Sequence, residues 1–193
     1  STPQSIFYMF NNADIRFESI TDRQGNEIGI SHGRFVPLLE SSDRDLRRKV
    51  FQSYYRSFDQ YKNTVAAIFA ANLKKEARHY ASSMEAHLSQ NNIPTAVYDQ
   101  LIEAVHDALP EMYRYVRLRR KMLGVEELHM YDVYTPLVSG EHASIPFDEA
   151  MEIVSRGLAP LGESYIQLLN EGMHGGWIDR YENKGKRTGA YSG

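Results

Sequence analysis

Four pairs of glutamate and histidine stand three residues apart in this chain, a spacing that can bind a metal ion. The pairs are Glu76 with His79, Glu103 with His106, Glu126 with His129, and Glu171 with His174. Residues three apart share one face of a helix. Two such pairs on facing helices, with one more Glu from each of two other helices, form a di-iron carboxylate site. One interpretation is therefore a stand-alone helical module that binds two iron ions or a protein partner.

The positions of these pairs favour a second interpretation, in which common surface residues coincide by chance. Glu103 and His106 lie off the apolar stripe of their expected helix, so they should face solvent. Glu126 and His129 follow Gly124 in a stretch that is typical of a loop. The sequence alone leaves both interpretations open.

Other catalytic and binding motifs are absent from the sequence. None of the seven histidines begins an H-E-x-x-H motif, and neither a G-x-S-x-G elbow nor a phosphate-binding G-x-x-x-x-G-K-[ST] loop occurs. The basic run from Arg114 to Lys121 is a possible nucleic-acid contact, but the net charge of −3 favours a solvated helix face. We therefore expect no nucleic-acid partner.

Composition indicates a globular protein of one domain or two small ones. The 193 residues are 42% hydrophobic and 24% charged. No apolar run approaches the roughly 20 residues that cross a bilayer, so we expect no membrane partner. The chain contains no cysteine and shows no signal sequence, which favours a cytoplasmic location.

Hydrophobic periodicity predicts a mainly α fold with one small β-hairpin. Residues 15–20 and 27–32 alternate in polarity around a turn that contains Gly25 and Asn26. Leu46, Val50 and Phe58 recur with helical spacing after Ser42, which we expect to be the N-cap. The expected helices cover residues 42–58, 60–80, 82–88, 95–109, 112–122, 147–158 and 161–173. Thr95 is the expected N-cap of the fourth, Pro110 should interrupt it, and Gly124 should end the fifth.

Both ends of the sequence suggest a piece of a longer protein. It begins at Ser1 with no initiator Met, and it ends with the glycine-flanked segment 185–193. A strand in that segment needs a partner for its backbone N–H and C=O groups. We expect the partner to lie in the rest of a longer chain.

Nine short stretches, in this order, resemble one family. They are FNNAD at 10–14, DRQGNE at 22–27, SHGRF at 31–35, LESSDR at 39–44, NNIP at 91–94, ELHMYDVYTPL at 127–137, LAPLGE at 158–163, WID at 177–179 and NKGKRTGAYS at 183–192. Together they are similar to oligoendopeptidase F, a zinc metallopeptidase related to thimet oligopeptidase. The resemblance covers essentially the entire chain, and the segments at 127–137 and 183–192 are the most specific.

The resemblance implies a helical, clam-like peptidase that encloses short peptides and binds zinc through an H-E-x-x-H helix. In the family that helix follows the GKRTGAYS-like segment. This chain lacks it, so the expectation is a fragment with no catalytic centre and no zinc of its own. Residues 1–124 would form a helical region with the hairpin at about 15–35, and residues 125–193 would begin the catalytic domain.

The resemblance also implies roles for two groups of residues near the C-terminal end. Gly189, Ala190 and Tyr191 would form an edge strand that binds the peptide substrate through backbone hydrogen bonds. Trp177, Ile178 and Tyr181 would face the missing catalytic helices. We expect them to be exposed here and to promote self-association, because contiguous apolar surface drives association.

Overall fold

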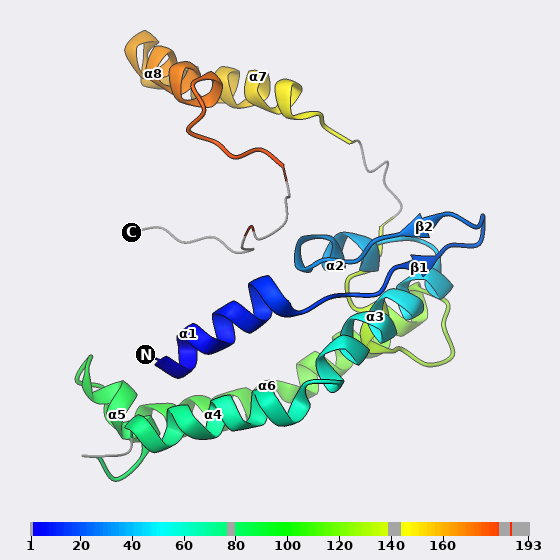
Figure 1. Ribbon diagram of the computed structural model, residues 1–193. Helices are drawn as coiled ribbons and strands as arrows, with labels where there is room; N and C mark the ends of the chain where they lie inside the picture. The colour runs from blue at the N-terminus through cyan, green and yellow to red at the C-terminus, as the bar shows by residue number, and fades with distance from the viewer. Residues whose placement is uncertain (1, 77–79, 139–143, 182–185, 187–193) are drawn as a thin grey trace. The chain divides into compact units, whose positions relative to one another are not determined.

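The computed structural model describes residues 2–76, 80–138, 144–181 and 186. Its contacts divide the chain into two compact units. Unit 1 comprises residues 1–137 with 185–193, and unit 2 comprises residues 138–184. Figure 1 shows that helices dominate each unit, and among the described residues the one small hairpin belongs to unit 1. The predicted mainly α fold is therefore confirmed.

Unit 1 opens with helix α1 (Thr2–Met9), a π-helical turn η1 (Phe10–Asp14) and the hairpin. The strands β1 (Ile20–Thr21) and β2 (Glu27–Ile28) are antiparallel, with Ile20 opposite Ile28. The Asp22 carboxylate accepts hydrogen bonds from the backbone N–H groups of Gln24 and Asn26, at 2.9 and 2.8 Å, and so closes the turn. The predicted hairpin exists, but its strands are shorter than the alternating runs.

Helix α2 (His32–Leu39) replaces the end of the predicted second strand. Ser31 is its N-cap, because the Ser31 hydroxyl accepts a hydrogen bond from the Arg34 N–H at 3.2 Å. A Ser or Thr oxygen at this position satisfies one of the unpaired donors of the first helical turn. The alternation at 27–32 therefore ends where the capping interaction begins.

The core of unit 1 lies between α2 and helix α3 (Arg44–Asp59). Leu39 and Val50 are essentially inaccessible to solvent, and Ile30 joins them. A half-buried shell surrounds them, formed by Phe17, Ile20, Phe35, Leu38, Leu46, Phe51, Tyr54 and Tyr131. This shell includes aromatic rings from segments far apart in the sequence, so it ties the hairpin, α2, α3 and residue 131 together.

The N-cap predicted for α3 is wrong by one residue. The carboxylate of Asp43, rather than Ser42, accepts hydrogen bonds from the N–H groups of Asp45 and Leu46. Helices α4 (Lys62–Glu76) and α5 (Ser83–Ser89) follow, as predicted. Ser82 caps α5 by accepting a hydrogen bond from the Glu85 N–H at 3.0 Å.

Helix α6 (Thr95–Met122) is continuous through Pro110, so the predicted interruption is wrong. Proline deprives the carbonyl four residues earlier, that of His106, of its helical donor. Pro110 and His106 are both exposed, so water can solvate that carbonyl. Pro94, not Thr95, occupies the N-cap position and offers no side-chain hydrogen bond. Gly124 follows the helix with a φ of 64°, as expected for a glycine that ends a helix.

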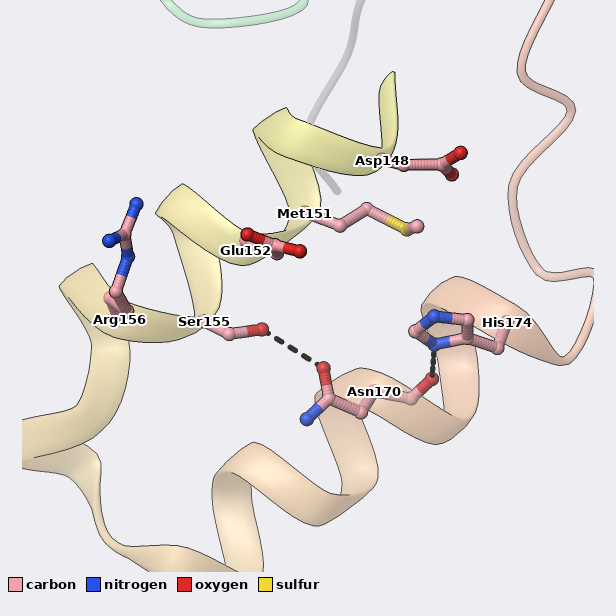
Figure 2. Close-up of a pocket in the computed structure, with 7 residues that line it drawn as sticks. All are labelled: Asp148, Met151, Glu152, Ser155, Arg156, Asn170 and His174. Carbon is pink, nitrogen blue, oxygen red and sulfur yellow. Dashed lines mark hydrogen bonds between the residues drawn. The ribbon is translucent and has the colours of Figure 1, made fainter. Parts of the chain in front are cut away.

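A short 3-10 helix, η2 (Met130–Asp132), lies in unit 1 after α6. Unit 2 contains α7 (Phe147–Leu158), a 3-10 turn η3 (Ala159–Leu161) and α8 (Glu163–His174). Helices α7 and α8 pack against each other and leave an open polar groove of about 470 Å³ (Figure 2). In the described part of the chain, no helix is both long and apolar enough to cross a membrane.

Candidate functional site

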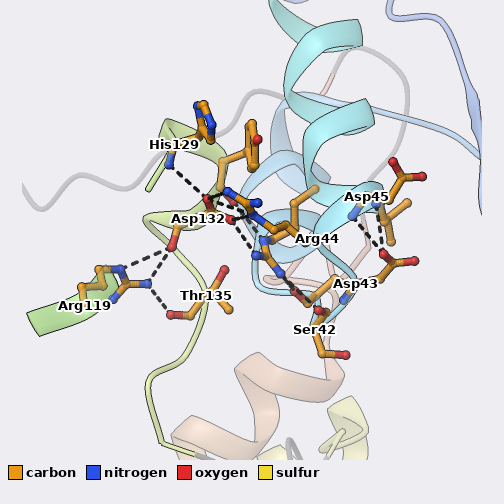
Figure 3. Close-up of polar contacts among 12 residues, drawn as sticks. Ser42, Asp43, Arg44, Asp45, Arg119, His129, Asp132 and Thr135 are labelled. Atoms are coloured by element: carbon orange, nitrogen blue, oxygen red, sulfur yellow. Dashed lines mark hydrogen bonds and ion pairs between the residues drawn. The ribbon is translucent and has the colours of Figure 1, made fainter. Parts of the chain in front are cut away.

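The most concentrated polar cluster of unit 1 surrounds Asp132, at the end of η2. Its carboxylate is fully buried and accepts hydrogen bonds from two arginines of α3 (Figure 3). Arg47 Nη2 lies 2.6 Å from Oδ1, and Arg44 Nη2 lies 3.0 Å from Oδ2. The backbone N–H of His129 donates to Oδ2 at 3.0 Å. The cluster therefore holds the segment around residue 132 against the N-terminal turn of α3.

Arginine side chains also bind the backbone of the same segment. Arg119 of α6, itself buried, donates to the carbonyl oxygen of Asp132 at 3.0 Å and to that of Thr135. Arg47 donates to the carbonyl oxygen of Tyr131 at 3.1 Å. A guanidinium with several N–H donors in a fixed plane suits such multiple acceptors. Arg44 and Arg47 of α3 and Arg119 of α6 thus bind residues 129–135. We call this set of contacts the arginine clamp.

The clamp keeps Asp132 ionised. Burial opposes the charged form, but hydrogen bonds from Arg44, Arg47 and the His129 N–H outweigh it and lower the pKa of Asp132. The hydrogen bond from Arg44 to Asp132 is also the main cause of a raised pKa for Arg44. A carboxylate with both oxygens occupied by donors is poorly suited to accept a substrate proton. The clamp is therefore a positioning device rather than a catalytic acid or base.

The glutamate–histidine pairs do not meet in the described part of the chain. His129 stacks on Tyr131 with ring centroids 4.9 Å apart, and His174 Nδ1 donates to the carbonyl oxygen of Asn170 at 2.8 Å. Glu103 and His106 are exposed on α6. His79 lies outside the described residues. Within those described, no group of three or more His, Cys, Asp or Glu side chains is placed to hold a metal ion, so they do not fit a metal centre.

The groove of unit 2 contains hydroxyl, imidazole and carboxylate groups that do not form a catalytic pair. The Ser155 hydroxyl donates to Asn170 Oδ1 at 2.9 Å, and the ring of His174 is engaged with the Asn170 backbone (Figure 2). A serine nucleophile needs a base within hydrogen-bond reach. Here its partner is an amide oxygen, so the groove does not have the geometry for nucleophilic catalysis.

The residues predicted to bind substrate, Gly189, Ala190 and Tyr191, lie outside the described residues. The predicted exposure of the residues after α8 is found, since Trp177 is 68% exposed and Tyr181 is 71% exposed. One face of the Trp177 ring nevertheless covers Gly172, where an added Cβ would lie 2.4 Å from the ring. Trp177 thus belongs to a shallow apolar groove of about 240 Å³ on α8.

Residues 37–193 match the sequence model of peptidase family M3. The chain belongs to peptidase family M3. Among its relatives, oligopeptidase PepF of Bacillus subtilis (strain 168) is 46% identical over 97% of this chain and 29% of that protein. The plasmid-encoded oligoendopeptidase F of Lactococcus lactis subsp. cremoris is 36% identical over 100% of this chain and 33% of that protein.

Solved structures agree with this assignment to the M3 family. The oligoendopeptidase F of Enterococcus faecium is 37% identical, with a TM-score of 0.68 over 89% of this chain and 33% of that one. A peptidase structure from Chlamydophila abortus, described as putative, is 32% identical, with a TM-score of 0.67 over 100% of this chain and 33% of that one. The predicted resemblance to oligoendopeptidase F is confirmed. This M3 chain spans about a third of the length of the relatives it matches.

Sequence reasoning missed the arginine clamp of this M3 chain. The apolar stripe of Leu46, Val50 and Phe58 does not indicate that an arginine of the same helix is buried, yet Arg47 is only 3% exposed. The available signal was the acidic residue Asp132 within the family-like segment 127–137, between apolar neighbours. A carboxylate in that setting needs a cationic partner, but the sequence did not indicate which arginine supplies it.

Proposed function

We propose that this chain is part of a zinc metalloendopeptidase that hydrolyses short peptides. Membership of peptidase family M3 carries the proposal, since the family match covers residues 37–193. The relatives bear the names oligopeptidase and oligoendopeptidase, which describe endopeptidases of short peptides. The absence of cysteine agrees with a reducing compartment such as the cytoplasm.

The proposed contribution of this chain is a wall of the substrate channel rather than the catalytic centre. Its sequence contains no H-E-x-x-H motif, and its described residues do not form a metal cluster. Zinc, with its ligands and the general base, would therefore belong to the rest of the longer protein. Residues 1–124 would form the helical wall, and residues 125–193 would begin the catalytic domain. The di-iron alternative lacks support from any cluster among the described residues.

Within the intact enzyme, Gly189, Ala190 and Tyr191 are the proposed substrate-binding residues. Glycine and alanine allow close approach of another backbone, and a tyrosine ring can contact a peptide side chain. Backbone pairing along a strand edge tolerates many substrate side chains, which suits an enzyme of broad peptide range.

Replacing Ala190 with proline in the full-length protein tests this role. Proline removes one backbone donor and stiffens the strand. We expect the turnover of a short fluorogenic peptide to fall about tenfold or more, as for the loss of one or two backbone hydrogen bonds. Zinc content, measured by mass spectrometry, should remain unchanged. Ala190→Ser, which keeps the N–H, is the matched control and should retain turnover.

The same measurements distinguish the parts of the proposal. Unaltered turnover in Ala190→Pro would remove this segment from the substrate contacts but leave the peptidase assignment intact. A full-length protein with no chelator-sensitive peptide hydrolysis would overturn the assignment itself.

A further inference from the structure

The chain turns back after α8 at two adjacent glycines. Gly176 has a φ of 85°, a conformation that favours glycine. At Gly175 an added Cβ would lie 2.5 Å from the carbonyl oxygen of Glu171, so a side chain has no room there. Residues 177–181 therefore return to the helices of unit 2, and we call them the return segment.

Arg180 of the return segment makes three contacts with the two helices of unit 2. Its Nη2 donates a hydrogen bond to the carbonyl oxygen of Met173 at 3.3 Å. Its guanidinium lies over the ring of Phe147, 4.6 Å from the ring centroid, and its Nη1 lies 3.6 Å from Oδ1 of Asp148. Because Phe147 and Asp148 begin α7 and Met173 is near the end of α8, one side chain joins both helices.

Two of these contacts should account for most of the attachment of Arg180. The last carbonyl groups of a helix lack a helical donor, and that of Met173 is among them. A cation that donates to such a carbonyl also complements the negative end of the helix dipole. The ring of Phe147 attracts the guanidinium through its quadrupole. The ion pair with Asp148 adds little, since this side chain is 84% exposed.

We propose that Arg180 is a positioning residue, which fixes the start of the chain that leads to the substrate strand. This inference rests on the proposed function, in which Gly189, Ala190 and Tyr191 bind the peptide. Gly189 is nine residues beyond Arg180, and nine extended residues span at most about 32 Å. Without this anchor, the nearest residue held in a helix is His174, fifteen residues before Gly189. A longer tether lowers the effective concentration of the strand at the bound peptide.

Time-resolved fluorescence anisotropy of Trp177, the one tryptophan of the chain, tests the anchor in the 193-residue chain. Arg180→Ala should increase the amplitude of the fast depolarisation, because the indole is then held only by its own contact with Gly172. The matched control is Arg156→Ala, at an exposed arginine of α7 outside these contacts, and it should leave the depolarisation unchanged. Far-UV circular dichroism verifies that each variant is folded. An unchanged depolarisation in Arg180→Ala would overturn the proposal.

Steady-state kinetics of the full-length protein test the positioning role. Arg180→Ala should raise KM for a short fluorogenic peptide about two- to fivefold, as expected for the longer tether. The value of kcat and the zinc content should remain unchanged, because only the binding of the peptide is weakened. A merely structural role would instead reduce the fraction of active protein and therefore kcat. Arg156→Ala should leave both constants unchanged.

A double-mutant cycle attributes the effect to the ring contact. Phe147→Leu removes the aromatic ring but keeps an apolar side chain, and it should raise KM in the otherwise unchanged protein. In the Arg180→Ala background it should add little, because the contact is already lost. Additive effects, or a KM that Arg180→Ala leaves unchanged, would overturn the positioning role and leave the peptidase assignment intact. A full-length protein without chelator-sensitive hydrolysis would overturn the proposed function, and the positioning role with it.

Discussion

Both carboxylate oxygens of Asp132 accept hydrogen bonds from at least two donors, although the side chain has no contact with solvent. Oδ1 accepts from Arg44 Nε and Arg47 Nη2, and Oδ2 accepts from Arg44 Nη2 and the His129 N–H. A buried ion pair stabilises a fold only weakly relative to apolar packing, but the loss of one partner leaves an uncompensated buried charge. Removing one partner of the Asp132 ion pairs should therefore lower the free energy of unfolding by a measurable amount.

Asp132→Asn should destabilise unit 1 by about 3–5 kcal/mol, because buried Arg47 loses its counter-charge. Urea denaturation followed by circular dichroism measures the free energy of unfolding. Asp45→Asn is the control, since Asp45 pairs with Arg48 and Lys49 at the surface of α3. Its loss should lower the free energy of unfolding far less, because ion pairs at the surface contribute little to stability. Equal effects at the two positions would show that the clamp does not stabilise the fold.

The difference between the original chain and Asp132→Asn should also depend on pH. The folded-state pKa of Asp132 is lowered, so its stabilisation is present above the unfolded-state value of about 3.9. It is lost as the pH falls through the folded-state pKa. The two stability curves should therefore be well separated at neutral pH and converge below pH 4. Curves that stay parallel into acid would mean that Asp132 is not ionised in the folded chain.

For single residues, the sequence predicts that the segment around Asp132 matters but not which side chains contact Asp132. The stretch at 127–137 was singled out by its resemblance to a family, and the structure places Asp132 there. The partners Arg44 and Arg119 are separated from it by 88 and 13 residues. Periodicity describes only which face of a helix is apolar, so it does not reveal that a long arginine side chain reaches a carboxylate on another element.

Among the elements, α8 and the segment that follows it are joined by Gly172 and Trp177. The chain reverses after α8, with the Trp177 N–H 3.4 Å from the Gly172 carbonyl oxygen, and the indole ring then lies over the glycine. Gly172 is buried, and a Cβ there would meet the ring at 2.4 Å. The absence of a side chain at 172 therefore determines where the ring rests.

Gly172→Ala should displace the ring of Trp177, the one tryptophan of this chain. The emission spectrum should shift towards that of a fully solvated indole, and acrylamide quenching should increase. Gly157→Ala in α7 is the matched control, because an added Cβ there meets open space. It should stabilise its helix by about 0.5–1 kcal/mol and leave the emission unchanged. An unchanged spectrum in Gly172→Ala would contradict the contact.

Element types were predictable because they depend on local patterns. The helices expected at 147–158 and 161–173 correspond to α7 and α8, and the pattern after Gln60 corresponds to α4. The errors arise where two local signals compete. Ser42 and Asp43 are both good N-cap residues, and only the path of the chain decides between them. At Pro110, solvent access to one carbonyl allowed the helix to continue despite the missing donor.

For the whole molecule, the main fact is that the chain spans about a third of the length of its relatives. Its most deeply buried apolar residues lie between α2 and α3, whereas α6 and the segment after α8 expose large apolar side chains. Stable domains normally cover such surfaces.

The last prediction separates this chain from the longer protein in which we place it. The 193-residue chain should hydrolyse no short peptide in a chelator-sensitive manner and should retain less than one zinc per chain after dialysis. Metal-dependent hydrolysis needs several converging ligands. The sequence has no H-E-x-x-H motif, and the described residues bring no such ligands together. Parallel assays of the full-length protein are the positive control. Chelator-sensitive cleavage by the short chain, with stoichiometric zinc, would show that its own residues form a catalytic centre.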